Sequence, residues 1–397
     1  MRTRDAVVIG AGPAGLAAAA ELRRAGRNPV VLERADQLAA KWPTYYDGMR
    51  LQSPRWLTSL PGFRIPRDLG RWLERDAFVE YLQRYAAHHC LTVEFGTHVE
   101  RVDRHPDEGW TVETDGGAWH SPIVVIATGY NHIPQLPAWP GREGFTGALI
   151  HSSQFRNAQP YQGKDVLVVG AGNSAAEIAK ILAAGGAARV RLAVRTPPHI
   201  VPLQVLGVPS LFAGVLVRHM PTRLADKALG TSANLSIGNL SRYGLRRPSA
   251  GIYTQYRRTM VTPILDTGVV DAIKQGRVEV VGAVESFAGA EVVLAGDDRV
   301  TPDAVIAATG YRRGLEPLVG HLGVVGPDGL PVAIGGRVTP GAPGLHFVGY
   351  THPFSGAIRE MAIDARRLGR VVRANSELTI NPTTARSPEL TYPGAAR

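Results

Sequence analysis

The 397-residue sequence predicts an α/β fold of two Rossmann-like dinucleotide-binding domains, one of them inserted into the other. Two glycine-rich turns of one type begin 160 residues apart, at Gly10 and at Gly170. Each turn follows an apolar strand and opens an Ala-rich helix. An apolar strand that ends in Ala-Thr-Gly-Tyr also occurs twice, at 123–130 and 305–311, on either side of the second turn. The second domain is therefore expected inside a discontinuous first domain.

Each position of the two turns has an expected mechanical role. The first glycine permits the tight turn, the second lets the backbone approach a pyrophosphate, and the last small residue lets the helix lie close to its strand. The helix N-terminus then offers free N–H groups to phosphate. The predicted contacts are Gly10, Gly12, Pro13, Ala14 and Gly15 in the first turn, and Gly170, Gly172, Asn173, Ser174 and Ala175 in the second. A repeated structural turn without a ligand is the alternative.

The residue that follows the next strand distinguishes the two nucleotides. Glu33 follows the strand at 29–32, where a carboxylate accepts hydrogen bonds from a ribose. Arg195 and Thr196 occupy the corresponding place in the second unit, where an arginine binds a 2′-phosphate that a carboxylate would repel. The first unit is thus predicted to bind FAD and the second to bind NADPH.

The remaining expected contacts lie in loops and at strand ends. Small residues after the repeated strands let a cofactor come close, and the residues that open the final helix direct N–H groups toward the flavin. These contacts are Arg34, Lys41, Trp42, Val99, Ala127, Thr128, Gly129, Ala308, Thr309, Gly349, Ser355 and Ala357. Trp42, Tyr45 and Trp56 stand in an aromatic and proline-rich loop, and are either flavin or substrate contacts or loop core.

The predicted FAD domain covers 1–160 and 300–375, the NADPH domain covers 161–299, and 376–397 form a flexible tail. Apolar residues at helical spacing predict an amphipathic helix over 75–89. Alternating residues at 91–95, 99–102 and 110–114 predict an antiparallel insertion on the first sheet.

Composition narrows the class of protein. A net charge of +10 with arginines scattered along the chain favours a solvated surface and phosphate-bearing cofactors over nucleic acid. The single cysteine, Cys90, excludes a paired-thiol redox centre, and no metal site is expected.

The apolar stretch 200–217 is too short and too interrupted by Pro202 and Pro209 to span a membrane. It is expected to be a buried or lid-like segment, and contact with a membrane surface or a homodimer stays open. Without a signal peptide, a cytoplasmic protein is expected.

One segment identifies a family resemblance. Residues Phe145 to Phe155 fit the pattern Phe-x-Gly-x-x-x-His-x-x-x-Phe/Tyr, which is typical of flavin-containing monooxygenases. Segments at 46–51, 59–62, 242–248, 262–266, 344–349 and 362–367 are similar to the plant YUCCA type and its bacterial relatives. The resemblance covers nearly the whole chain and implies a glutathione-reductase-like arrangement of the two domains.

The resemblance implies an NADPH-dependent FAD monooxygenase. NADPH would reduce the flavin, and a C4a-hydroperoxide formed with O2 would pass one oxygen atom to a small organic substrate by N- or S-oxygenation or by oxidative decarboxylation of an α-keto acid. Many members place Asn in the loop that faces the flavin, where this chain has Gln52 and Ser53. These two are the candidates for orienting the flavin or its peroxide, with a polar turn as the alternative. His151 of the motif is expected to link the domains.

Two other functions remain open at this point. The basic charge and the apolar stretch would also suit an electron-transfer reductase that passes electrons from NADPH to a quinone without oxygenation. A dinucleotide sensor without turnover is the third hypothesis. The Phe145 to Phe155 motif favours the monooxygenase.

Overall fold

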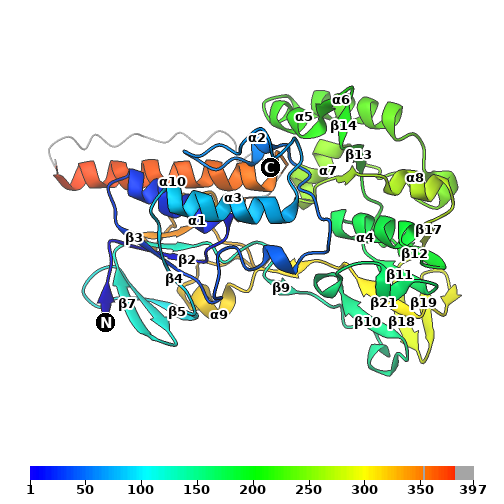
Figure 1. Ribbon diagram of the computed structural model, residues 1–397, viewed down its shortest axis with the longest axis horizontal. Helices are drawn as coiled ribbons and strands as arrows, with labels where there is room; N and C mark the ends of the chain where they lie inside the picture. The colour runs from blue at the N-terminus through cyan, green and yellow to red at the C-terminus, as the bar shows by residue number, and fades with distance from the viewer. Residues whose placement is uncertain (352–353, 381–397) are drawn as a thin grey trace, which may run out of the picture.

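The computed structural model describes residues 1–351 and 354–380 as two units, each built on a five-stranded parallel sheet (Figure 1). The first sheet has the order β23-β8-β2-β3-β4. Its strands are β23 (Leu345–Phe347), β8 (Val124–Ile126), β2 (Ala6–Ile9), β3 (Pro29–Leu32) and β4 (Thr92–Glu94). Nearly every residue of the central strands is apolar and buried, as a parallel sheet covered on both faces requires.

The second sheet has the order β10-β21-β11-β12-β17 and repeats the plan of the first. Its strands are β10 (Ala148–His151), β21 (Ala304–Ala307), β11 (Asp165–Val169), β12 (Arg189–Ala193) and β17 (Glu279–Val281). The predicted domain boundaries at 160 and 300 are therefore corrected, because β10 and β21 both belong to the second sheet. The repeated Ala-Thr-Gly-Tyr strands are equivalent strands of the two units, since β8 pairs with β2 as β21 pairs with β11.

Each face of the first sheet has its own cover. Ala6 and Val8 pack toward α1 (Pro13–Arg24), α3 (Arg75–His88) and α10 (Ala357–Ile380). Val7 and Ile9 pack toward a small mixed sheet, antiparallel except for β1, and α9 (Glu316–Val319). This alternation follows from the two-residue period of a strand. The small sheet has the order β1-β7-β6-β5, with β1 (Arg2–Thr3), β7 (Gly117–Ser121), β6 (Trp110–Thr114) and β5 (Val99–Arg104).

Helix α3 confirms the helix expected over 75–89. The antiparallel insertion is confirmed for 99–102 and 110–114 but wrong for 91–95, because β4 joins the first sheet as a parallel edge strand. Helix α10 continues to Ile380, past the predicted start of a tail at 376, and residues 381–397 lie outside the described part of the chain.

The second sheet is covered in the same way. One face carries α4 (Asn173–Ala184) and α8 (Val269–Lys274), and the other carries a three-stranded antiparallel sheet. That sheet consists of β18 (Val284–Ala288), β19 (Glu291–Leu294) and β20 (Arg299–Val300). The two units are thus internal repeats of one architecture.

A helical segment is inserted between β12 and β17 and lies at one edge of the molecule, above α4 in Figure 1. Strand β13 (Ile200–Pro202) pairs in parallel with β16 (Ile264–Asp266), and these strands bound the insertion. Between them lie the hairpin β14 (Gln204–Val205) and β15 (Val208–Pro209), and the helices α5 (Ser210–Val217), α6 (Thr222–Ser236) and α7 (Ile252–Thr259). No helix in residues 1–351 and 354–380 is both long enough and apolar enough to cross a membrane.

The two units are joined by paired connections. Strand β9 (Ile133–Pro134) runs toward the second unit, and β22 (Tyr311–Arg312) returns from it. They pair antiparallel, with Tyr311 opposite Pro134. The amide of Gln135 extends this pairing by donating to the carbonyl of Gly310 at 3.0 Å.

Candidate active site at the two glycine-rich turns

The first glycine-rich turn is shaped by a backbone that approaches it from β8. Gly10 has a φ of +104°, and a Cβ at this position would lie 2.7 Å from the carbonyl oxygen of Ala127. A Cβ at Gly15 would lie 1.8 Å from the carbonyl oxygen of Gly10. Both positions therefore require glycine for packing alone.

The second turn has the same construction. Gly170 has a φ of +145°, and a Cβ there would lie 2.4 Å from the carbonyl oxygen of Ala308. The small residues Ala127 and Ala308 thus end equivalent strands and contact equivalent turns. Their repeated occurrence in the sequence has a direct structural cause.

Gly12 and Gly172 differ from these packing glycines. A Cβ at either position would meet no protein atom within 4 Å. Both residues have extended φ and ψ angles, −80° and −179° at Gly12 and −113° and 179° at Gly172, and each precedes the first turn of a long helix. The protein itself does not demand glycine here, so the open space at each helix N-terminus fits a pyrophosphate that lies against the backbone.

Glu33 lies at the carboxyl end of β3 and holds the first turn. Its Oε2 accepts the amide of Ala11 at 2.8 Å, and its Oε1 accepts the amide of Ala35 at 3.0 Å. Each carboxylate oxygen has a second lone pair, which leaves acceptors for a ribose hydroxyl. Glu33 therefore combines a structural bond with the geometry of a ribose acceptor.

Arg195 and Thr196 follow β12 in the corresponding place, and both are exposed. In the described part of the chain, no hydrogen bond or ion pair engages the Arg195 guanidinium. An arginine without an internal partner at this strand end fits the 2′-phosphate of NADPH.

Comparisons with known proteins agree with this geometry. The sequence model of the family described as pyridine nucleotide-disulphide oxidoreductase matches residues 7–200. An indole-3-pyruvate monooxygenase, YUCCA1 of Oryza sativa subsp. japonica, is 36% identical over 351 residues, which cover 87% of this chain and 86% of that protein. A probable indole-3-pyruvate monooxygenase of Arabidopsis thaliana, also YUCCA1, is 33% identical. The matched region covers 87% of this chain and 84% of that protein.

The chain belongs to the flavin-containing monooxygenase family. It is an NADPH-dependent FAD monooxygenase, which confirms the predicted activity and both cofactors. The fold agrees with a flavin-containing monooxygenase from Stenotrophomonas maltophilia, at a TM-score of 0.72 and 23% identity over 95% of this chain and all of that chain. That likeness confirms the predicted fold class of two Rossmann-like domains.

The two catalytic candidates of this monooxygenase have different surroundings. Gln52 is half-buried, and its Nε2 donates to Glu177 Oε1 on α4 at 3.3 Å. Ser53 is buried, and its hydroxyl is 2.8 Å from the hydroxyl of Thr58 in the short helix α2 (Arg55–Thr58). The Ser53 hydroxyl is thus engaged within its own loop, whereas Gln52 reaches across to the second unit.

Glu177 organises a polar network that the sequence analysis missed. Its carboxylate is almost fully buried, and Lys180 Nζ donates to its Oε2 at 2.9 Å. Thr267 donates its hydroxyl to the other carboxylate oxygen, and Lys180 also reaches the Thr267 hydroxyl at 3.0 Å. Together with Gln52, these contacts connect α4, the segment after β16 and the loop of the first unit. The signal in the sequence was the spacing Asn173, Glu177, Lys180, which places three polar side chains along one side of α4.

We expect Glu177→Ala to retain FAD but to raise the KM for NADPH. The change leaves the Lys180 ammonium half-buried without its carboxylate and frees the Gln52 loop from α4. Hydrogen bonds to a charged group contribute about 1.5–3 kcal/mol, so an increase of about tenfold or more is expected. Steady-state kinetics measure it, with Glu285→Ala on the exposed side of β18 as the control. An unchanged KM would mean that the network does not position the NADPH side of the site.

Asn173 and Ser174 begin α4. Asn173 Oδ1 accepts the amide of Leu265 at 2.9 Å and so fixes β16 against α4, whereas Ser174 is exposed. Of the two predicted contacts, Ser174 is the one whose side chain the protein leaves accessible.

The start of α10 carries a second polar cluster. Ser355 is buried, and its hydroxyl donates to Glu360 and accepts Arg359 Nη1 at 2.7 Å. Glu360 also pairs with Arg218, which follows α5, at 3.1 Å. The predicted flavin contact Ser355 is thereby fixed in place, while Ala357, at the first position of α10, is exposed.

Asp364, on the buried side of α10, accepts the Thr351 hydroxyl at 2.9 Å and the Gly349 amide at 3.3 Å. Gly349 has a φ of +89° and lies against Ala14, which a Cβ would approach to 2.8 Å. Burial raises the pKa of the Asp364 carboxyl to about 6, although the two hydrogen bonds oppose the change. Asp364 thus fixes Gly349, a predicted FAD contact, beside the first glycine-rich turn.

A raised carboxyl pKa makes stability depend on pH with a definite sign. Between about pH 4 and pH 6 the folded protein holds a proton that the unfolded chain has lost, so stability falls as pH rises through this window. The shift corresponds to about 3 kcal/mol at most. We expect Asp364→Asn to reduce this dependence, which urea unfolding at pH 4.5 and pH 7 measures. An identical pH dependence in both proteins would contradict an Asp364 that is protonated on folding.

The aromatic loop residues separate into core and surface. Trp42 packs edge-on against Phe78 of α3 at 4.6 Å between ring centroids, so it belongs to the loop core. Tyr45 packs beside Trp42 at 5.8 Å. Trp56 is 40% exposed and lies 6.1 Å from Phe212 of α5, so it contacts the helical insertion.

Several predicted contacts gather where the connections cross between the units. Burial and then Arg34 lower the pKa of Lys41, whose ammonium lies 5.3 Å from the centre of the Tyr311 ring. Thr128 shares a hydrogen bond with the Tyr350 hydroxyl at 2.8 Å, and Thr309 donates to the Gln135 carbonyl at 2.5 Å. Gly129 and Val99 are half-buried, and Val99 packs against the core between the first sheet and the small sheet.

His151 lies at the same crossing. The ring is buried, with Nε2 3.0 Å from the Gly310 carbonyl and Nδ1 2.9 Å from the Ser153 hydroxyl. Burial lowers the pKa of His151, which favours the neutral ring. The geometry agrees with a hydrogen-bonded linker at the boundary between the two units.

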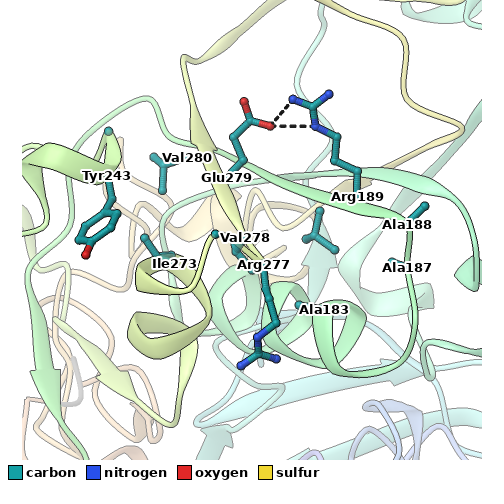
Figure 2. Close-up of a pocket in the computed structure, with 13 residues that line it drawn as sticks. Ala183, Ala187, Ala188, Arg189, Tyr243, Ile273, Arg277, Val278, Glu279 and Val280 are labelled. Atoms are coloured by element: carbon teal, nitrogen blue, oxygen red, sulfur yellow. Dashed lines mark hydrogen bonds and ion pairs between the residues drawn. The ribbon is translucent and has the colours of Figure 1, made fainter.

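Two cavities lie in the second unit. A small hollow is lined by Gly170, Gly172 and Ala175, at the predicted NADPH turn. A larger one of about 650 Å³ lies at the outer edge of the sheet, where Arg189 binds Glu279 with two N–H groups (Figure 2). The larger cavity contains none of the predicted site residues. Within residues 1–351 and 354–380, no three His, Cys, Asp or Glu side chains gather as ligands of a metal would.

Proposed function

We propose that this monooxygenase catalyses the oxidative decarboxylation of an arylpyruvate. The similarity to the rice indole-3-pyruvate monooxygenase, at 36% identity over 87% of the chain, carries the proposal. In the balanced reaction, the α-keto acid, O2, NADPH and one proton give CO2, water, NADP⁺ and a carboxylic acid that is one carbon shorter. One oxygen atom of O2 enters the acid and the other becomes water.

The cofactor residues are proposed by their places in the two turns. Gly10, Gly12 and Glu33 would hold FAD, while Gly170, Gly172 and Arg195 would hold NADPH. When bound, these cofactors supply the electrons and the oxygen chemistry, and the protein supplies position and exclusion of water. Gln52 is proposed as the polar group that orients the reacting centre, held by Glu177. Ser53 would support the same loop through Thr58.

The surroundings of the α10 N-terminus support an aromatic acid as substrate. Phe354 packs against Tyr256 at 4.4 Å and against Tyr253 at 5.3 Å between ring centroids. Arg359 lies half-buried next to Ser355 and 3.5 Å from Glu360, and its remaining N–H groups would bind a substrate carboxylate. Aromatic rings and a guanidinium at one place suit an arylpyruvate better than a simple amine.

The test measures oxygen, NADPH and products together. With indole-3-pyruvate we expect equal consumption of NADPH and O2, with release of CO2 and the shortened acid. Hydrogen peroxide as the only product of O2 would reject this substrate class. NADPH oxidation with a quinone and without O2 uptake would instead support the electron-transfer reductase.

A cytoplasmic location and a homodimer stay predictions of the sequence. Light scattering of the purified protein measures the assembly state, and fractionation of cells measures the location.

A further inference from the structure

The helical insertion between 206 and 261 has an unusual surface. Among the described residues, eight of the fifteen exposed large apolar side chains lie in this segment. Leu206 at the tip of the β14–β15 hairpin is 99% exposed, and Leu235 of α6 is 84% exposed. Leu206 also has a positive φ of 47°, which L residues rarely adopt. The protein therefore buries little of either leucine, and both side chains are accessible to a partner.

The exposed leucines of α6 form a stripe. Leu224, Ala228, Thr231 and Leu235 are all exposed, and their spacing places them on one face of the helix. Ala225, on another face of α6, is fully buried. The exposed cations Arg223 and Lys227 flank the stripe. Helix α6 is therefore amphipathic in the sense of an interfacial helix, with an apolar face turned away from the protein.

The charge of the insertion is strongly one-sided. Residues 206–261 contain eight Lys and Arg and a single acid, Asp226, a net charge of +7 out of +10 for the whole chain. All eight cations are exposed, and among the described residues only Arg218 has an acidic partner. Asp226 is turned inward, where it accepts the amides of Tyr253 and Thr254 at the start of α7. The insertion holds eight of the 44 Lys and Arg of the chain but one of its 34 Asp and Glu, so its positive charge arises from a lack of acids.

We infer that this insertion docks on an anionic lipid bilayer through the surface that its exposed leucines and cations form. Figure 1 shows β14, α5 and α6 together at one edge of the molecule, where they are able to meet a common plane. Exposed leucines enter the acyl boundary while the surrounding cations meet lipid phosphates. A second copy of the chain would bring +7 against +7 in a symmetric contact, and nucleic acid would leave the leucines in water. Lipid satisfies both the charge and the apolar side chains.

The same surface is attached to the proposed site. Gly214 of α5 lies so close to Phe354 that a Cβ would be 2.6 Å from its carbonyl oxygen. Arg71 of the first unit donates to the Gly207 carbonyl at 2.8 Å and to Gln204 at 3.2 Å, which fixes the hairpin. Docking would therefore place the start of α10 next to the bilayer. The inference does not depend on the substrate proposed above.

Sedimentation of the FAD-containing protein with vesicles tests the inference. We expect binding to vesicles of phosphatidylcholine and phosphatidylglycerol in equal amounts, little binding to phosphatidylcholine alone, and weakening by salt. Each cation near the surface contributes about fivefold, so Arg223→Gln with Lys227→Gln should weaken binding about 25-fold. Leu206→Asn with Leu235→Ser should also weaken it, and asparagine accepts the positive φ at 206.

The matched controls are Val332→Ser with Val338→Ser, and Arg101→Gln with Arg299→Gln, which change exposed residues outside the insertion. They should bind vesicles as the unchanged protein does. Retained FAD absorbance and NADPH oxidation in solution verify that every variant is folded. Absence of vesicle binding, equal binding to neutral vesicles, or unchanged binding of the insertion variants would overturn the inference. So would a dimer that the same variants dissociate, because a second copy would then cover the surface.

Discussion

Gly12→Val protein is expected to fold normally and to be purified without FAD. A Cβ at Gly12 meets no protein atom within 4 Å, and the extended backbone at this residue is accessible to valine. The new side chain would occupy the space where a pyrophosphate meets the N-terminus of α1. Losing two hydrogen bonds to a charged phosphate, each worth about 1.5–3 kcal/mol, weakens FAD binding by about 100-fold or more.

Flavin absorbance of the purified protein and its circular dichroism measure the two parts of this prediction. Gly15→Val is the contrasting variant, because its Cβ would lie 1.8 Å from the Gly10 carbonyl oxygen and should prevent folding. Gly172→Val is the matched variant of the second unit and should retain FAD while losing NADPH. A fully yellow Gly12→Val protein would show that the first turn does not hold the flavin.

The second large effect is expected at Arg195. Arg195→Ala should raise the KM for NADPH by about 10- to 150-fold, because a charge-assisted bond to the 2′-phosphate contributes about 1.5–3 kcal/mol. The KM for NADH, which lacks that phosphate, should hardly change. The ratio of the two values isolates the phosphate contact from any general disturbance of the site.

Arg189 is the matched control. It is the first residue of β12, whereas Arg195 lies two residues beyond the last, and it pairs with Glu279. Arg189→Ala should leave the preference for NADPH intact. Equal losses with NADPH and NADH in Arg195→Ala would remove Arg195 from the proposed role.

The sequence predicted the parts of this fold that depend on local patterns. The glycine-rich turns, the helix at 75–89 and the antiparallel strands at 99–114 follow from residue spacing, because a period of two or of 3.6 residues is visible in one segment. The assignment of strands to sheets was less successful. Strand β4 joined the first sheet in parallel, and β10 and β21 joined the second, because a buried apolar strand carries no local mark of its partner.

The candidate site shows the same division. Gly12 and Glu33 in the first βαβ unit, and Arg195 in the second, were predicted from their spacing. A βαβ unit fixes where its turn and its strand ends lie, so local spacing is enough. Glu177 and Asp364 were missed because their partners, Gln52 and Thr351 among them, come from other segments of the chain. Burial of a carboxylate is a tertiary property, and a sequence pattern of single charges does not distinguish it from a solvated face.

The paired connections β9 and β22 limit how the two units can move. Both chain crossings belong to one antiparallel ribbon, which the bonds from Gln135 and Thr309 extend, so the two covalent links between the units form a single tether. Such a tether permits twisting and bending about one axis but opposes sliding of one unit past the other. A rotation about this ribbon would change the separation of the two glycine-rich turns, which is the distance that matters for passing electrons from one nucleotide to the other.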